Sequence, residues 1–243
     1  MKRTKLAALF AAVATALPLT ASAGLIWTET GPSGAGDLLP TAQTIYDSAF
    51  NPLSEIRGSL SVTVPPSGPI FQVDLYKIRI NDFANFSAKT VSPDPLTTDD
   101  TALYLFNDTG YGVYMNDDNL NPANLLSTLP SGDANSPASN GIYYLAVALG
   151  GFVANDALSA SLFAAGASTD VLGSSGSGPL AGWNPGFPAQ SELPFAYDII
   201  LTGANNGELP EPGSLALLMA GGIGAWLARR SWRAAPSPSV AAA

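Results

Sequence analysis

The sequence predicts an all-β protein, an antiparallel β-sandwich of jelly-roll-like form, with a signal helix before it and one hydrophobic helix after it. Three observations support this prediction. The middle of the chain alternates short apolar runs with Gly, Pro, Asn and Asp, which is typical of strands and turns. No segment before Leu209 has the spacing of an amphipathic helix. Both ends of the 243-residue chain carry apolar runs beside basic residues.

The first 23 residues have the three parts of a secretory signal peptide. A basic start precedes the apolar run Leu6–Leu17, and Ala21 and Ala23 supply the small residues of an A-x-A motif. The alternative is an amphipathic first helix, but Leu6–Leu17 has no polar face. We therefore expect export through the Sec translocon and cleavage by signal peptidase after Ala23, so that Gly24 begins the mature protein.

Residues 24–204 are expected to form the β-sandwich. Strands are predicted where β-branched and aromatic residues gather between turn formers. The predicted strands are Gly58–Val64, Phe71–Ile80, Thr101–Asn107, Tyr111–Asn116, Gly141–Leu149, Ala157–Ala164 and Phe195–Gly203.

Three details refine this pattern. The apolar phase shifts within Phe71–Ile80, which indicates a β-bulge or a strand covered on both faces. The sequence "NDTG" at Asn107–Gly110 predicts a hairpin turn. The Gly- and Ser-rich stretch Gly173–Pro188 is expected to be a long loop.

Composition excludes several functions. The chain has no histidine and no cysteine, which removes Ser-His-Asp and Cys-His catalysis, the usual zinc sites, haem and iron–sulfur ligation, and disulfides. Between Gly24 and Glu208 there are four basic and eighteen acidic residues, a net charge of −14. Because such a surface repels phosphate backbones, nucleic acid is not an expected partner.

The C-terminal segment combines prolines, an apolar run and arginines. Residues 205–212 form a linker that ends in Pro210, Glu211 and Pro212, and the prolines exclude a helix there. The following residues, 213–228, are an uncharged run of sixteen, about 24 Å long as a helix, against a bilayer core of about 30 Å. Arg229 and Arg230 then open a basic tail at 229–243 that we expect on the cytoplasmic side. The run is a removable sorting helix, a permanent single-span anchor or a core helix, and its all-round apolarity disfavours the last.

Pro210-Glu211-Pro212, the apolar run and Arg229-Arg230 together resemble the PEP-CTERM sorting signal of Gram-negative bacteria. In that family an exosortase, an integral-membrane enzyme, recognises the tail and processes it near the Pro-Glu-Pro. The resemblance implies an inner-membrane intermediate and then a place at the cell surface or in the extracellular matrix, in bacteria that make extracellular polysaccharide and biofilm. The chain beyond residue 230 is longer than is usual in that family.

The central region resembles the bacterial prepeptidase C-terminal domain. The resemblance rests on "DLYKIRI" (Asp74–Ile80), "TALYLFNDTGYGVYMNDDN" (Thr101–Asn119), "LLSTLPSG" (Leu125–Gly132) and "GIYYLAVAL" (Gly141–Leu149). Members are jelly-roll-like β-sandwiches attached to secreted enzymes; relatives bind collagen or polysaccharide, and some carry calcium. The family's E-P-N segment, which supplies part of its calcium ligands, is replaced here by "ETGPSGAGD" (Glu29–Asp37).

A calcium site can be built from oxygen ligands alone. The candidates are Asp74, Asp108, Asn116, Asp117 and Asp118, on one predicted strand and two adjacent turns. The alternative is that these side chains cap β-turns, as Asp and Asn do through local hydrogen bonds.

Polysaccharide binding would use aromatic side chains that stack on sugar rings. Trp183 and Phe187, in "GWNPGFP", are the candidate ligand residues. The alternative is that both fold back onto the sandwich. A matrix protein without a discrete ligand also fits the sequence.

We expect no enzymatic activity. Glu29, Glu55 and Glu192 are the glutamates of the predicted domain, and none has a placed carboxylate partner for glycoside hydrolysis. Lys77 and Lys89 lack the S-x-x-K spacing of a Ser-Lys mechanism. The alternatives to a sorted envelope protein are a membrane-anchored binding domain of a secreted enzyme system and a secreted hydrolase that uses carboxylates.

Overall fold

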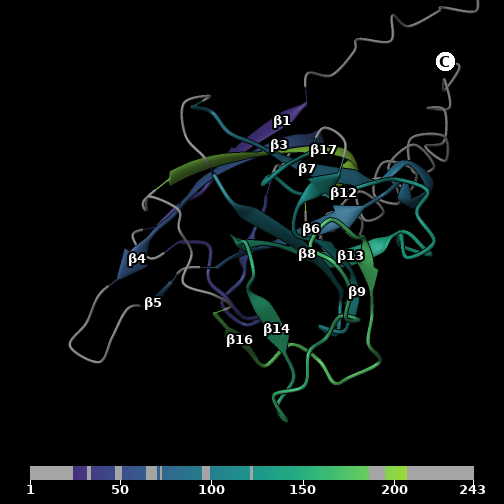
Figure 1. Ribbon diagram of the computed structural model, residues 1–243. Helices are drawn as coiled ribbons and strands as arrows, with labels where there is room; N and C mark the ends of the chain where they lie inside the picture. Colours follow the sequence, from purple (N-terminus) through teal and green to yellow (C-terminus); the bar gives the residue numbers. More distant parts are fainter. Residues whose placement is uncertain are drawn as a thin grey trace, which may run out of the picture.

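The computed structural model describes residues 24–31, 34–46, 51–63, 70–71, 73–94, 99–120, 123–185 and 195–206 (Figure 1). These residues form strands and turns, with one short 3-10 helix, η1 (Phe83–Asn85), and no α-helix among them. The all-β prediction is therefore confirmed. The predicted signal peptide, the Phe187 region and the predicted C-terminal helix lie outside the described residues. Within the described ranges, no helical segment has the length and hydropathy of a membrane span.

The strands range from two residues, as in β2, to twelve residues in β17. In chain order they are β1 (Leu25–Thr28), β2 (Gln43–Thr44), β3 (Pro52–Leu60), β4 (Val62–Thr63), β5 (Ile70–Phe71), β6 (Asp74–Ile80), β7 (Ser87–Val91), β8 (Thr101–Asn107), β9 (Gly112–Asn116), β10 (Asn119–Leu120), β11 (Ala123–Asn124), β12 (Thr128–Leu129), β13 (Gly141–Leu149), β14 (Val153–Asn155), β15 (Leu172–Gly173), β16 (Gly182–Asn184) and β17 (Phe195–Asn206).

One large mixed sheet contains most of these strands. Its main path is β1-β3-β17-β6-β13-β8-β9-β15, and β2, β7 and β12 join it at the side. The prediction of a purely antiparallel sheet is wrong at two pairs, because β1 pairs parallel with β3 and β2 pairs parallel with β6. Both parallel strands come from the N-terminal segment, and the long connections that follow them allow the crossover that parallel pairing needs.

The large sheet bends into a sandwich-like arrangement at β17. One side of β17 pairs with β3. The other side pairs with β7 up to Thr202 and with β6 from Ala204 onward. The change of partner occurs at Gly203, which has a left-handed φ of 70°. In Figure 1 the group β1, β3, β17, β7 and β12 lies above the group β6, β13, β8 and β9.

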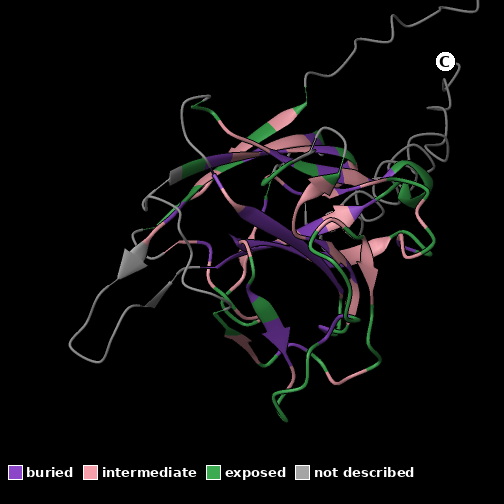
Figure 2. Ribbon diagram, viewed as in Figure 1, coloured by how far each residue is buried: buried purple, intermediate pink, exposed green. Residues whose placement is uncertain are grey.

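The centre of the molecule is formed by β8 and β13, which are buried on both faces (Figure 2). One face of β8 meets the opposite group of strands, where the Thr101 and Thr90 hydroxyls lie 2.7 Å apart. The other face carries Tyr104 and Phe106, which are covered by rings from the later part of the chain. Burial on both faces explains why these strands read as continuous apolar runs.

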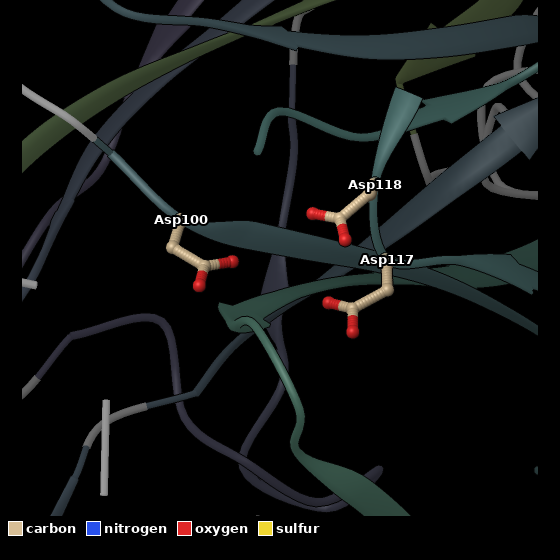
Figure 3. Close-up of side chains that lie close together, drawn as sticks. All are labelled: Asp100, Asp117 and Asp118. Carbon is tan, nitrogen blue, oxygen red and sulfur yellow. The ribbon is translucent and has the colours of Figure 1, made fainter. Parts of the chain in front are cut away.

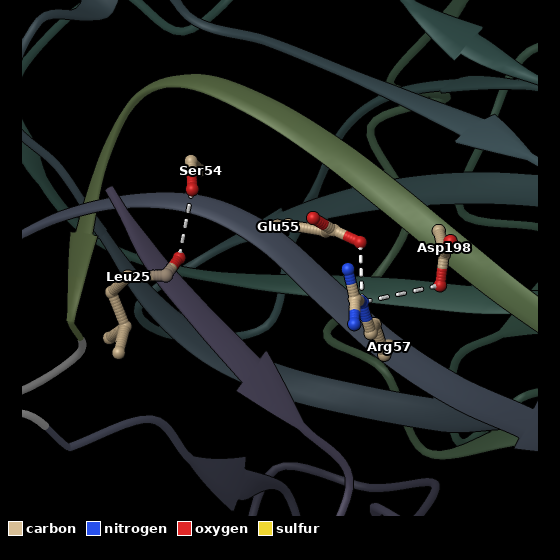
Figure 4. Close-up of polar contacts among 5 residues, drawn as sticks. All are labelled: Leu25, Ser54, Glu55, Arg57 and Asp198. Carbon is tan, nitrogen blue, oxygen red and sulfur yellow. Dashed lines mark hydrogen bonds and ion pairs between the residues drawn. The ribbon is translucent and has the colours of Figure 1, made fainter. Parts of the chain in front are cut away.

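Strand β1 pairs with β3, and one side-chain hydrogen bond between them is drawn in Figure 4. The Ser54 hydroxyl donates to the Leu25 carbonyl oxygen at 3.1 Å. Nearby on β3, Arg57 Nε lies 2.6 Å from Glu55 Oε1 and 3.9 Å from Asp198 Oδ1 on β17. Gly24, the predicted first residue of the mature protein, precedes β1 directly and packs against Ser54 so closely that a side chain would overlap it.

Most of the predicted long strands are confirmed. Thr101–Asn107 and Gly141–Leu149 coincide with β8 and β13. The predicted turn at Asn107–Gly110 joins β8 to β9 as an antiparallel hairpin, with φ of 89° at Gly110. The apolar phase shift, from Leu75 to Tyr76, falls inside β6, where Asp74, Leu75 and Tyr76 are all buried, so the strand is covered on both faces there.

Other boundaries are corrected by the structure. Ala157–Ala164 is not a strand: Asp156 Oδ1 accepts the N–H groups of Leu158 and Ala160 and holds a turn there. Gly173–Pro188 is not wholly a loop, since it holds the end of β15 and all of β16. β17 continues to Asn206, past the predicted start of the linker at 205. The strand predicted at Gly58–Val64 begins earlier, at Pro52.

Candidate functional site

Three carboxylates meet at one end of the β8–β9 hairpin. Asp100 precedes β8, and Asp117 and Asp118 follow β9. The antiparallel pairing of Leu103 with Asn116 brings the start of one strand to the end of the other. One carboxylate oxygen from each aspartate lies within 4.8 Å of the others, and the side chains converge in Figure 3. We call Asp100, Asp117 and Asp118 the acidic triad.

The turn after β13 positions the triad. The Gly151 N–H donates to both Asp117 carboxylate oxygens, at 3.1 and 3.2 Å. The Gly150 N–H donates to the Asp100 carbonyl oxygen at 3.1 Å. A Cβ at residue 150 would come within 2.5 Å of Asp100 Cγ, so a side chain there would displace the Asp100 carboxylate. The turn at residues 150–151 therefore holds Asp117 by its carboxylate and Asp100 by its main chain.

The triad carries negative charge that basic side chains do not neutralise. Burial raises the pKa of Asp117 to about 6, the Gly151 N–H partly opposes this, and the charges of Asp118 and Asp100 raise it further. Burial and the charge of Asp118 also raise the pKa of Asp100. Both ion pairs in the described part of the chain involve Arg57, on the other group of strands.

The donor set suits a hard divalent cation. Three carboxylates supply oxygen ligands only, which Ca²⁺ and Mg²⁺ prefer, and Ca²⁺ completes its six to eight ligands with carbonyl groups and water. A cation there would also relieve the repulsion that raises the pKa of Asp117. The triad thus fits calcium on charge and ligand type.

Two of the five calcium ligands proposed from the sequence belong to the triad, namely Asp117 and Asp118. Asn116 lies beside them with its amide engaged: Oδ1 accepts from the Thr128 N–H at 2.8 Å, and Nδ2 donates to the carbonyl oxygens of Asp118 and Asp170. Asp108 lies in the turn at the opposite end of the hairpin. Asn116 therefore shapes the loop of Asp118 through hydrogen bonds.

Asp74, the fifth proposed ligand, lies in the interior with 0% of its surface exposed. Its Oδ1 accepts the Ala35 N–H at 2.9 Å, and its Oδ2 accepts the Tyr197 hydroxyl at 2.8 Å. The Tyr197 and Tyr76 hydroxyls lie 2.7 Å apart. Burial raises the pKa of Asp74 to about 7, the Ala35 N–H opposes this, and the charge of Glu29 raises it further. Asp74 thus belongs to a buried polar network that is separate from the triad.

Sequence reasoning missed Asp100 as a member of the triad. Asp100 joins the triad through the register of the β8–β9 hairpin, which brings it close to Asp117, seventeen positions later in the sequence. The signal was present in two parts: the predicted "NDTG" turn and the acidic pairs Asp99-Asp100 and Asp117-Asp118 outside the two strands that it joins.

Trp183, a candidate ligand residue, lies on β16 and covers the outer face of β8. Its ring centroid lies 5.1 Å from that of Tyr104 and 6.0 Å from that of Phe106, edge-on in both cases. Its Nε1 donates to the Asp37 carbonyl oxygen at 2.7 Å. This is the packing expected of a tryptophan that folds back onto the sandwich. Phe187, the other candidate, lies outside the described residues.

Two of the three glutamates considered for catalysis make contacts with other groups in the structure. Glu29 Oε2 accepts the Ser59 N–H at 2.9 Å, and burial raises its pKa. Glu55 pairs with Arg57. Glu192 lies outside the described residues.

A cavity of about 570 Å³ adjoins the triad and shares Asp117 with it. Its walls come from β8, β9, the turn between β13 and β14, and the segment between residues 161 and 172. Aromatic and aliphatic side chains dominate the walls, among them Tyr104, Phe163, Met115 and Leu172.

The sorting residues Pro210, Glu211, Pro212, Arg229 and Arg230, and the cleavage residues Ala21 and Ala23, lie outside the described residues. Their roles stay predictions from the sequence. Comparison with known proteins gave no match for this chain among protein-family models, curated proteins or solved structures.

Proposed function

We propose that this chain is an exported, non-enzymatic protein of the cell envelope or extracellular matrix that an exosortase sorts through its C-terminal tail. One observation carries the proposal: Pro210-Glu211-Pro212, an uncharged run of sixteen residues and Arg229-Arg230 follow one another in that order. The signal-peptide pattern at the other end supports it. The jelly-roll form and the relation to the prepeptidase C-terminal domain belong to the same proposal.

Intact-mass measurement tests the sorting step. The protein is expressed in a Gram-negative host that has an exosortase and in the matching exosortase-deletion strain. We expect the exported protein of the first strain to begin at Gly24 and to lack everything beyond about Pro212, and the tail to be retained in the second strain. Replacement of both Pro210 and Pro212 by alanine should also preserve the tail.

Retention of Arg229 on the exported protein of the exosortase-positive strain would contradict the proposal. That result would favour the alternative in which residues 213–228 are a permanent single-span anchor. The same measurement detects any added glycan as extra mass.

Calcium binding at the acidic triad is the second function that we propose. It is favoured by three converging carboxylates with no ion-pair partner among the described residues. Calcium is abundant outside the cell, and the extracellular modules that bind it do so weakly, with dissociation constants of about 10⁻⁴–10⁻³ M. Binding there would link the turn before β8 to the turn after β9.

Isothermal titration with CaCl₂ tests this function. We expect Asp117→Asn and Asp118→Asn each to weaken binding by about tenfold or more, because each removes a charged ligand. Asp108→Asn is the matched control, since Asp108 is exposed at the other end of the same hairpin and should leave affinity unchanged. No heat with the unaltered protein, or an equal loss in the control, would remove calcium from the proposal.

Polysaccharide binding is retained as a proposal for the exported domain, and Trp183→Ala tests it in a polysaccharide pull-down. Because Trp183 packs on Tyr104 and Phe106, this variant needs a melting curve beside the binding measurement. Binding unaffected by the substitution in a folded variant would exclude the β16 region as the sugar-binding surface.

A further inference from the structure

The cavity beside the triad has the size and lining of an organic-ligand site. Its volume of about 570 Å³ falls in the range of about 300–1,000 Å³ that is typical of small-molecule sites. Phe163 and Tyr104 form part of its wall, and both are buried in the structure. Met115 and Leu172, which are partly buried, pair across β9 and β15 and add two flexible aliphatic side chains.

The mouth of the cavity is formed by small residues. Residues 164–168 read "AAGAS", are exposed, and all line the cavity. No side chain in this segment extends beyond a methyl or hydroxymethyl group, so the segment leaves the space beside Phe163 open. Two other polar groups of the wall already have partners: the Tyr104 hydroxyl donates to the Phe152 carbonyl oxygen at 2.6 Å, and the Ser161 hydroxyl donates to the Phe163 carbonyl oxygen at 2.9 Å.

Asp117 is the one carboxylate among the described residues that line the cavity, and no lysine or arginine is among them. Its oxygens accept the Gly151 N–H, which leaves further acceptor capacity on both. Asp100 and Asp118 lie within the same 4.8 Å cluster and add to the negative potential at this end. The cavity therefore joins an apolar body to a negatively charged end.

We propose that this cavity binds a small amphipathic organic cation, with its ammonium group against Asp117 and its hydrocarbon body against Phe163, Met115 and Leu172. Charge complementarity selects the cation, because an anion would be repelled by three aspartates. The apolar wall selects the hydrocarbon body, since it offers few free partners for the hydroxyl groups of a sugar. This binding depends neither on sorting nor on calcium, although calcium and the organic cation would both contact Asp117.

Titration calorimetry of the purified exported protein, with EDTA present, tests the proposal. The probe is octylammonium below its micellar concentration, and octyl glucoside and octyl sulfate supply the same chain with neutral and anionic heads. We expect the ammonium probe to bind at least about tenfold more tightly than either of the others, as a charge-assisted contact predicts. EDTA removes calcium, so failure of the calcium site does not affect this measurement.

Two variants locate the binding. Asp117→Asn should lower the affinity for the ammonium probe by about tenfold and leave the affinity for octyl glucoside unchanged, because the amide keeps the shape of the side chain and removes its charge. Ala165→Trp should lower the affinity for the ammonium probe, because the indole fills the mouth of the cavity. Asp108→Asn should leave this affinity unchanged. Equal affinity for the neutral and cationic probes would overturn the proposal. So would undiminished binding in both Asp117→Asn and Ala165→Trp with melting curves like that of the unaltered protein.

Discussion

Asp74 is the residue whose environment departs most from that of an ordinary aspartate. It is completely buried, and its carboxylate accepts one backbone N–H and one tyrosine hydroxyl without a basic partner. Tyr76, Tyr197 and Glu29 are the other titratable groups around it. Burial therefore outweighs the two hydrogen bonds and raises the pKa of Asp74 to about 7.

The raised pKa predicts that the domain loses stability as the pH rises. The pKa of Asp74 is about 7 in the folded state, whereas that of an unperturbed aspartate is 3.8. Folding therefore favours the protonated form of Asp74. Its contribution is fully present below pH 4 and is lost as the pH rises through about 7. We expect the free energy of unfolding in urea to fall by about 2–3 kcal/mol between pH 5 and pH 8.

Asp74→Asn separates this effect from other titrations. The amide can accept the Ala35 N–H and donate to the Tyr197 hydroxyl, so the network survives with one hydrogen bond reversed. The variant should match the unaltered protein near pH 4 and exceed its stability at pH 8. The pKa of Asp117 is raised as well, so a small slope should persist in the variant. An unchanged slope would show that Asp74 does not titrate in this range.

At the scale of single elements, β17 determines how the two groups of strands meet. Gly203 marks the point where β17 leaves β7 and joins β6. A Cβ there would lie 2.5 Å from the Asp82 carbonyl oxygen and 3.0 Å from the Phe86 backbone. Its φ of 70° is also a conformation that residues with a Cβ rarely adopt. The bend therefore needs glycine for two reasons, conformation and close approach.

A pair of glycine substitutions separates these two reasons. Gly203→Ala should lower the free energy of unfolding by about 3 kcal/mol or more, because the methyl group meets backbone that cannot move aside. Gly132→Ala is the control: its φ is 71°, and no atom lies within 4 Å of the added carbon. It should cost about 1 kcal/mol, from the left-handed conformation alone. Equal costs in urea unfolding would show that the close approach at residue 203 has no energetic weight.

The long strands were predictable from the sequence because buried strands consist mainly of consecutive apolar and aromatic residues. Most of β8 and the second half of β13 are buried at successive positions, so apolar and aromatic residues follow one another and make these strands visible in the sequence. Two-residue strands such as β2 and β15 were not predictable, since they exist only through pairing with a distant strand. The apolar run after Asp156 misled because the Asp156 side chain accepts three backbone N–H groups and holds a turn.

The candidate site was predictable only in part, because its assembly depends on which strands pair and in which register. Asp117 and Asp118 stand out in the "NDD" turn, and both belong to the triad. Asp100 became visible only with the register of the hairpin. The cavity was not predictable, because its walls come from segments as distant in sequence as Tyr104 and Leu172.

At the scale of the whole molecule, net charge is the dominant property. Residues 24–208 carry four basic and eighteen acidic side chains, and the described ion pairs use a single arginine, Arg57. Repulsion among the acids opposes the folded state, and salt screens it over a Debye length of about 10 Å at 0.1 M. The stability of the domain should therefore depend on ionic strength even without a specific ion site.

This general effect predicts a measurement that isolates calcium. Raising NaCl from 10 to 300 mM should raise the melting temperature, because screening weakens repulsion throughout the molecule. At constant ionic strength, replacing part of the NaCl with CaCl₂ should raise it further, since an ion bound only by the folded state stabilises that state. In the combined variant Asp117→Asn and Asp118→Asn, NaCl should still raise the melting temperature, but CaCl₂ should no longer raise it further. If both salts still raise the melting temperature of the variant, calcium acts only as a screening ion, and the triad is an acidic surface without a specific ion site.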